Sequence, residues 1–281
     1  MVGIFGLLVG SFLNVVIYRL PVMLQRDLRR DARYVLDLEI ETQPRFNLAI
    51  PNSRCPCCDH AIRPWENLPV LSWLALRGRC SDCKAKISVR YPVIELATGL
   101  LSLFTAWHFG FGVQCVFAVV MVWGGIALFM IDLDTMLLPD SIVLPGIWIG
   151  LVGAYFGIFS TLDNALIGAC AGYLAFAIPA WLFSVITGRS GMGAGDFKLL
   201  ALFGAWLGWQ ALPIIVLLSA VSGSIIGLIA VRSIQFFRRD VATLQRGVLP
   251  AFVVWISHLV CRQVCVVAAI EALGVLALIE N

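Results

Sequence analysis

The sequence has few charged residues: Asp, Glu, Lys and Arg together make up 13% of its 281 positions. Hydrophobic residues make up 60%, and the mean hydropathy is +0.92. This composition excludes an ordinary soluble domain and indicates a protein of the lipid bilayer. The sequence also has no clear internal repeat or low-complexity tract. The membrane part is therefore expected to be one helical body and not a pair of duplicated halves.

Two further absences narrow the possible functions. The chain has no G-x-G-x-x-G fingerprint, and its one sizeable polar region is too short for a Rossmann unit. No basic residue precedes the first apolar segment, which is therefore interpreted as a membrane anchor and not as a cleavable signal peptide. The net charge of +3 is accounted for by the basic loops of a membrane protein, so no nucleic-acid partner is expected.

Apolar stretches close to the length of a membrane helix, about 17 to 25 residues, follow one another along the chain. They lie at about 3–18, 93–109, 114–131, 141–158, 165–187, 197–212, 213–231 and 248–275. This pattern predicts an all-α polytopic membrane protein with about eight transmembrane helices. The last stretch holds Arg262 at mid-length, where a charge is costly in a bilayer.

The positions of the basic residues predict the topology. Every Lys and Arg except Arg262 lies in or at the edge of four stretches, namely 21–92, 132–140, 188–196 and 232–247. The turns near 110–113 and 159–164 carry none. Because basic loops stay on the cytoplasmic side, the four basic stretches are expected to be cytoplasmic.

The polar region 21–92 contains two Cys-x-x-Cys pairs separated by 21 residues, formed by Cys55, Cys58, Cys80 and Cys83. This spacing indicates a four-thiolate zinc site. A disulfide or redox role is the alternative, but a cytosolic loop favours metal. Four thiolates leave no open coordination position, so the zinc is expected to be structural and to contribute to folding. Cys57 is an alternative ligand, and His60 is interpreted as a solvated loop residue.

Two aspartates, Asp132 and Asp196, each stand at the polar end of a long apolar segment. A carboxylate beside hydrocarbon is costly unless it is paired, hydrated or protonated, so the two form a candidate site. Two carboxyls brought together can share one proton and activate a water, which is aspartic protease chemistry.

Simpler interpretations of the acidic residues stay open. Asp196 is also suited to be the N-cap of the next helix, although the glycines at 191, 193 and 195 favour close approach of another backbone. Asp134 competes with Asp132 for the role of partner, but it lies farther from the hydrocarbon. Asp140 is interpreted as the N-cap of the helix that follows Pro139.

Several motifs occur together in a fixed order. They are Gly10 to Pro21, the two cysteine pairs, Ile87 to Pro92 with Glu95, Asp132 to Asp140, and Gly191 to Lys198. On these motifs, roughly residues 6–231 resemble the type IV prepilin peptidases, or prepilin leader peptidase/N-methyltransferases, of the GxGD aspartic protease class. The resemblance implies that Asp132 and Asp196 are the catalytic acids. The segment 247–252 departs from the P-F-G-P-like motif usual in this family.

The resemblance also implies a bifunctional, multi-pass enzyme of the bacterial inner membrane with its active site at the cytoplasmic face. Such an enzyme cleaves the leader of prepilins and pseudopilins, then methylates the new N-terminal amine with S-adenosylmethionine. Gly78 and Arg79 match a family segment tied to methylation. The expected domains are a first transmembrane helix (1–20), a zinc-binding, methylation-associated module (21–92) and an aspartic peptidase domain (93–281).

Two other functions compete with this one. The first is a presenilin-like membrane protease without methylation, for which the cysteine module has no evident use. The second is a non-enzymatic, zinc-stabilised membrane assembly factor or transporter, in which both aspartates cap helices or bind cations.

Overall fold

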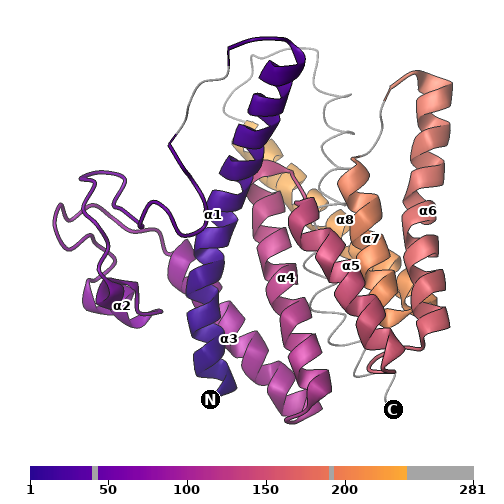
Figure 1. Cartoon of the computed structure of the whole chain (residues 1–281), viewed down its shortest axis with the longest axis horizontal. Coiled ribbons are helices and arrows are strands. Elements are labelled where there is room, and N and C mark those ends of the chain that lie inside the picture. Colours follow the sequence, from indigo (N-terminus) through magenta and orange to yellow (C-terminus); the bar gives the residue numbers. More distant parts are fainter. Residues whose placement is uncertain (40–43, 190–192, 239–281) are drawn as a thin grey trace. The chain divides into compact units, whose positions relative to one another are not determined.

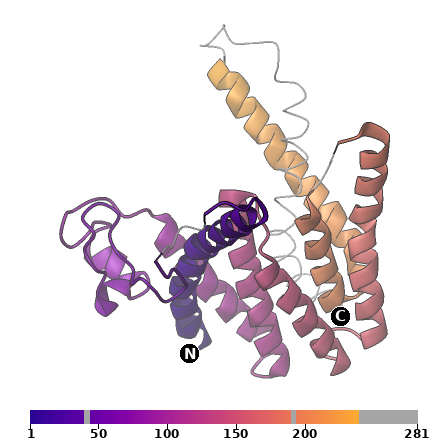
Figure 2. The ribbon, with the colours of Figure 1, turned by 45° about the horizontal axis from the view of Figure 1, so that its top comes forward.

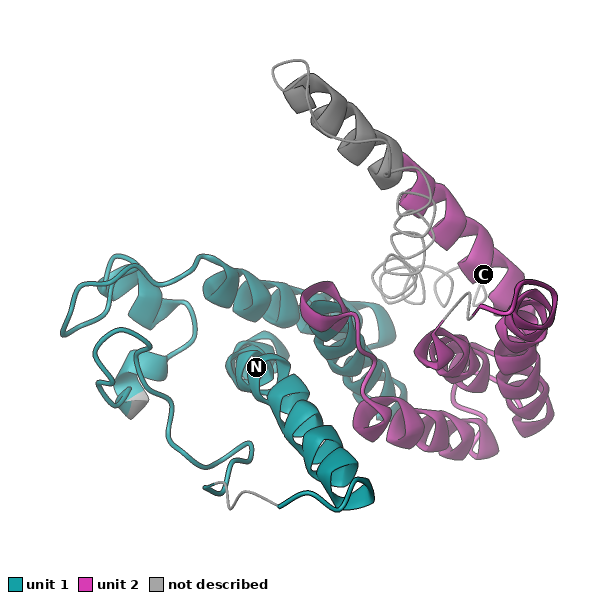
Figure 3. Ribbon diagram, turned by 90° about the horizontal axis from the view of Figure 1, so that it is seen from above, with its two compact units in different colours: residues 1–131 teal, residues 132–281 magenta. Residues whose placement is uncertain are grey.

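The structure is a computed structural model that describes residues 1–39, 44–189 and 193–238. Over these ranges the chain is helical, and the only β-type pairing is two isolated bridges in the cysteine region. The chain divides into two compact units, Met1–Ile131 and Asp132–Asn281 (Figure 3). The expected domain boundary at 92 marks the end of the polar region 21–92, and the division into three functional domains stays a prediction.

Figure 1 shows the helices in chain order. In the first unit they are α1 (Val2–Val35), the short η1 (Pro64–Asn67), α2 (Leu71–Ala75), α3 (Arg90–Phe109) and α4 (Val113–Thr135), whose last residues belong to the second unit. The second unit adds α5 (Asp140–Tyr155), α6 (Leu162–Thr187), α7 (Ala194–Leu207), the short η2 (Trp209–Ala211) and α8 (Leu212–Arg238).

The helices follow the predicted apolar segments from 3–18 to 213–231, and the last predicted segment, 248–275, lies outside the described residues. Gly208, with a φ of 79°, ends α7 and confirms the predicted division of the 197–231 stretch. Three described helices, α1, α4 and α6, are long and apolar enough to cross a membrane. The prediction of a helical membrane protein is therefore confirmed, while the count of about eight spans stays a prediction.

Helices α1 and α3 pack closely through small residues. A Cβ added at Gly6 would lie 2.8 Å from Ser102 Cβ, and one added at Gly10 would lie 2.8 Å from Glu95 Cα. Small side chains let helix backbones approach in a membrane, where no hydrophobic effect drives the helices together. The buried hydroxyls of Thr98 and Ser102 each donate to the carbonyl four residues earlier, at 2.7 Å. The polar groups in this contact are thereby satisfied.

Helix α1 continues as a helix well past its apolar part, through Pro21 to Val35. At the junction, the buried Arg19 guanidinium donates to the carbonyls of Asn47 at 3.0 Å and Pro51 at 2.6 Å. Arg19 therefore fastens the following loop to α1. In the sequence this arginine is a charge after the first apolar segment and a member of the Gly10 to Pro21 motif. Its carbonyl acceptors in the loop leave no sequence pattern.

In the second unit, α7 packs against both α5 and α6 (Figure 2). Gly168 and Gly204 bring the backbones of α6 and α7 into contact, and any Cβ at either position would collide with the partner helix. On the other side, Trp206 Nε1 donates to the Gly146 carbonyl of α5 at 2.8 Å. Side chains from Phe197 to Leu207 are almost all buried. This packing fixes the helix that begins beside Asp196.

Candidate metal centre and active site

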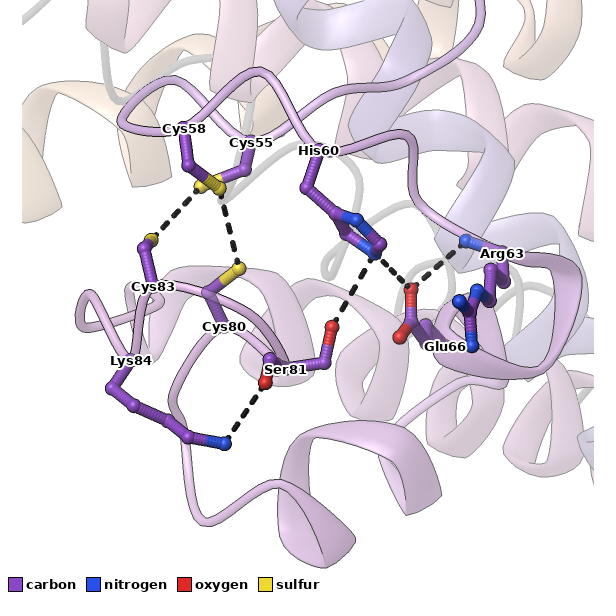
Figure 4. A network of polar contacts seen from close by, with 9 residues as sticks. All are labelled: Cys55, Cys58, His60, Arg63, Glu66, Cys80, Ser81, Cys83 and Lys84. Atoms are coloured by element: carbon purple, nitrogen blue, oxygen red, sulfur yellow. Dashed lines mark hydrogen bonds and ion pairs between the residues drawn. The ribbon is translucent and has the colours of Figure 1, made fainter.

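The cysteine pairs lie in two turns of the same construction. In the first, the Cys55 N–H donates to the His60 carbonyl at 2.9 Å, and Asp59 has a φ of 56°. In the second, the Cys80 N–H donates to the Ala85 carbonyl at 2.9 Å, and Lys84 has a φ of 60°. An isolated antiparallel bridge closes each turn. Figure 4 shows the two turns facing each other with their sulfurs between them.

The four sulfurs have the spacing of a tetrahedral metal site. All four lie within 4.8 Å of one another, with Cys55 Sγ 3.7 Å from Cys83 Sγ and Cys58 Sγ 4.0 Å from Cys80 Sγ. Four sulfurs bound at about 2.3 Å to one zinc ion would be about 3.8 Å apart. Both separations exceed the about 2.05 Å of a disulfide. The donor set and its geometry therefore fit one zinc ion, and the exposed Cys57 lies outside the cluster.

Backbone groups give the four thiols different pKa values. The N–H groups of Cys57 and Cys58 lower the pKa of Cys55 to about 7. Those of Asp82 and Cys83 likewise lower the pKa of Cys80. At Cys58 the His60 N–H acts in the same direction, but burial and the neighbouring thiols outweigh it and raise the pKa to about 12.

For Cys83 the N–H of Ala85 is similarly outweighed by burial and by neighbouring thiols, and the pKa of Cys83 is raised. Each turn therefore contributes one thiol with a lowered pKa and one with a raised pKa. A cation bound by all four sulfurs must displace the protons that remain.

The side chain of His60 joins the two turns (Figure 4). Its Nε2 lies 3.3 Å from Glu66 Oε2 and 3.4 Å from Ser81 Oγ. Glu66 also accepts a hydrogen bond from the Arg63 N–H at 2.9 Å, and this backbone bond is the main cause of its lowered pKa. The interpretation of His60 as a solvated loop residue is wrong: its side chain is only 21% exposed. Its partners come from the second turn, at Ser81, and from η1, at Glu66, and the sequence alone does not bring these segments together.

Gly78 and Arg79 stand at the start of the second turn and differ in environment. Gly78 is buried with a φ of 65°, and a Cβ there would lie 2.8 Å from Trp73 Cζ2. The local fold therefore requires glycine at this position. Arg79 is exposed. No observation tests a role of either residue in cofactor binding, and that role stays a prediction.

The two candidates for the first catalytic acid lie in different surroundings. Asp132 is 9% exposed, follows the fully buried Ile131, and lies in the last turn of α4. Asp134 is exposed. Helix α4 ends directly afterwards, where Met136 has a φ of 55°. The burial of Asp132 favours it as the acid nearer to hydrocarbon.

Asp196 is the third residue of α7, and it is partly exposed. The N-cap of this helix is Gly193, so the interpretation of Asp196 as an N-cap is wrong. Asp140 is the first residue of α5 and the N-cap there is Pro139, so the interpretation of Asp140 as an N-cap is wrong as well. The first two residues of the glycine run, Gly191 and Met192, lie outside the described residues.

Two contacts join the segments that carry the aspartates. Lys198 Nζ lies 2.8 Å from each carboxylate oxygen of Asp140. A Cβ added at Gly195 would lie 3.0 Å from Leu138 Cβ, which shows how closely the loop approaches the start of α7. The loop that follows Asp132 therefore lies against the first turn of α7, which bears Asp196. A direct pairing of Asp132 with Asp196 stays a prediction.

This fold and these sites define a helical membrane protein with a four-cysteine module and acidic residues at helix ends. Two family descriptions match it: the bacterial peptidase A24 N-terminal domain over residues 4–109, and the type IV leader peptidase family over residues 118–228. No solved structure matches the chain.

Curated relatives cover most of the same residues. A prepilin leader peptidase/N-methyltransferase of Stutzerimonas stutzeri is 57% identical over 82% of this chain and 80% of its own. That of Pseudomonas aeruginosa is 55% identical over 81% and 79%, and that of Aeromonas hydrophila is 50% identical over 81% and 79%. The chain belongs to the type IV leader peptidase family.

Proposed function

We propose that this protein is a bifunctional enzyme that removes the leader peptide of prepilins and pseudopilins and then methylates the new N-terminus. The observation that carries the proposal is the 57% identity to a prepilin leader peptidase/N-methyltransferase over four fifths of both chains. The presenilin-like and non-enzymatic alternatives account for neither this identity nor the match across the cysteine module.

For the cleavage step we assign Asp132 and Asp196 as a dyad. One carboxylate takes a proton from water while the other, protonated, donates to the carbonyl oxygen of the scissile peptide. The tetrahedral intermediate then collapses, and a proton passes to the leaving amine. The burial of Asp132 and the contacts of Leu138 with Gly195 and of Asp140 with Lys198 support this assignment.

For the cysteine module we assign one structural zinc ion to the four sulfurs. When bound, the ion would supply folding stability to a loop region with little hydrophobic core of its own. The two turns have the same backbone hydrogen bond, and the spacing of the four sulfurs is close to tetrahedral. Both observations support the assignment. His60 lies outside the cluster and links the first turn to Ser81 of the second turn and to Glu66.

We assign methyl transfer to the 21–92 module, with S-adenosylmethionine as the donor. The new N-terminal amine must be unprotonated and in line with the sulfonium methyl, which it attacks as the bond from that carbon to sulfur breaks. Arg79 is the exposed candidate for donor binding, whereas Gly78 is required by the turn itself. We place the enzyme in the bacterial inner membrane with about eight spans and both activities at the cytoplasmic face.

The test is incubation of the purified protein with a prepilin, with and without S-adenosylmethionine, followed by mass measurement of the products. We expect the mature pilin without donor and the same product heavier by one methyl group with it. Cleavage in the presence of S-adenosylmethionine without any increase in product mass would contradict the methyltransferase assignment. An unaltered prepilin under both conditions would contradict the proposed function as a whole.

A further inference from the structure

Residues 63–77, which include η1 and α2, expose large apolar side chains although they lie outside every predicted membrane segment. Trp65, Leu68, Leu71 and Leu74 are 62%, 47%, 66% and 58% exposed. Isolated exposed apolar residues need no explanation, but a group of them within ten positions marks an interaction surface. We call residues 63–77 the apolar loop.

The charges of the apolar loop are arranged at its two ends. Between Arg63 and Arg77 the only charged residue is Glu66, whose side chain is 11% exposed and turned toward His60 and the Arg63 N–H. Arg63 and Arg77 are both exposed. Tryptophan and leucine flanked by arginine are typical of segments at a membrane surface, because the apolar groups enter the lipid and the arginines reach the phosphates.

Hydrogen bonds fasten the apolar loop to the membrane part of its unit. The Val70 N–H donates to Glu95 Oε2 at 2.8 Å, and Ser11 Oγ donates to the Asn67 carbonyl at 3.5 Å. Ser11 lies within the apolar part of α1, a helix long and apolar enough to cross a membrane, and Glu95 lies on α3, which packs against it. The loop is thus held beside the apolar part of α1 and not beside the polar extension that follows Arg19.

The first turns of α3, which lie next to the apolar loop, also expose apolar side chains. Tyr91, Val93 and Leu96 are all exposed there, close in sequence to Glu95. Figure 1 shows α2 beside the start of α3. A partner of the apolar loop therefore has to be compatible with an adjacent helix surface that is apolar.

We propose that the apolar loop is an anchor that binds the membrane surface. Trp65, Leu68, Leu71 and Leu74 enter the boundary between headgroups and acyl chains, and Arg63 and Arg77 bind anionic lipid phosphates. The occupant is the bilayer, because the surface is apolar, is flanked by exposed arginines and is attached to α1, a candidate membrane span, and to α3, which packs against it. The anchor holds the cysteine module flat on the membrane face. This inference does not depend on the catalytic assignments.

The experiment places the full-length protein in nanodiscs of phosphatidylethanolamine and phosphatidylglycerol that contain a phospholipid with a photoactivatable diazirine on its acyl chain. Labelled peptides are mapped by mass spectrometry. We expect label on residues 65–76 at a level comparable with that on α1. The double variant Leu71→Glu/Leu74→Glu should lose this label several-fold, while the label on α1 is kept.

Leu36 provides the matched control, because it is 67% exposed but follows the polar extension of α1. It should carry no label, and Leu36→Glu should leave the labelling of 65–76 unchanged. The proposal is overturned if wild-type protein shows label on α1 but none on 65–76, whatever the variants do. It is also overturned if 65–76 is unlabelled and becomes protected from hydroxyl radicals only when a prepilin is added, since the surface would then bind substrate.

Discussion

The cysteine module and the aspartate region are built in opposite ways. Each cysteine turn is closed by a hydrogen bond between residues five positions apart, such as Cys55 and His60. The aspartate region is joined instead by an ion pair between Asp140 and Lys198, 58 residues apart in sequence, and by a close approach of Leu138 to Gly195. Short-range backbone hydrogen bonds therefore position the two sulfurs of each turn. The segments that carry the acids are positioned by the packing of helices that are distant in sequence.

The two regions therefore tolerate different substitutions. The sulfurs depend on short-range backbone bonds and on four specific side chains. The acids depend on the position of α7, which is set by Gly168 and Gly204 against α6 and by Trp206 against α5. Substitutions at the sulfurs should affect the module locally, and substitutions along the aspartate junction should affect cleavage without removing metal.

The largest effect is expected at the aspartates. Asp132→Asn or Asp196→Asn should lower prepilin cleavage by about 10³-fold or more, because an amide cannot cycle a proton. Cleavage in membranes is measured by the change in pilin mobility. The control is Asp134→Asn, which should be milder because Asp134 is exposed. An inactive Asp134→Asn beside an active Asp132→Asn would show that the first acid is wrongly assigned.

The next effect concerns the metal. Serine at any one of the four cysteines should lower the zinc content from about one ion per chain and increase hydrogen exchange in residues 45–92. Cys57→Ser is the matched control, since this exposed thiol lies outside the cluster. Elemental analysis and exchange mass spectrometry give the two readouts. Metal-free protein after purification without chelator, with oxidised cysteine pairs, would refute the zinc assignment.

The sequence was sufficient where structure is local or periodic. Apolar segments of membrane length predicted α1 and α3 to α8, because helix formation depends on neighbours in the chain. The spacing of the two Cys-x-x-Cys pairs predicted the sulfur cluster, because four-thiolate zinc sites use this spacing. It was insufficient where partners are distant. Neither the contact of His60 with Ser81 nor the ion pair of Asp140 with Lys198 leaves a pattern, since tertiary packing creates both. The N-cap alternative for Asp196 failed for a local reason, because α7 begins earlier, with Gly193 as its N-cap.

A smaller effect is expected at the ion pair that joins the aspartate segments. Its side chains are 28% and 54% exposed, so the pair contributes at most about 1 kcal/mol, or roughly a fivefold change in rate. Lys198→Met should lower kcat of cleavage by this order while KM is kept, because the loop after Asp132 loses its attachment to α7. Lys84→Met, in the cysteine module, is the control. If exchanging the charges with Asp140→Lys and Lys198→Asp gives no recovery over the single variants, the pair does not position the site.

The smallest effect is a change in the pH dependence of zinc binding. The pKa of Cys55 is lowered to about 7 and that of Cys58 is raised to about 12. Above pH 7 Cys55 is already a thiolate, whereas below pH 7 zinc must also displace its proton. The slope of the logarithm of zinc affinity against pH should therefore be steeper by about one below pH 7 than above it. Chelator competition from pH 6 to 8.5 measures this, and a constant slope would contradict the lowered pKa.

The central claim is that cleavage belongs to the aspartate region and methylation to the cysteine module. It is tested most directly by giving Asp196→Asn and Arg79→Gln, in separate reactions, an intact prepilin or a pre-cleaved pilin peptide with S-adenosylmethionine, and measuring the product masses. We expect Asp196→Asn to methylate the pre-cleaved peptide at the wild-type rate, and Arg79→Gln to cleave prepilin normally but to methylate slowly. Loss of methylation in Asp196→Asn, with peptide binding intact, would show one shared active site and contradict the account.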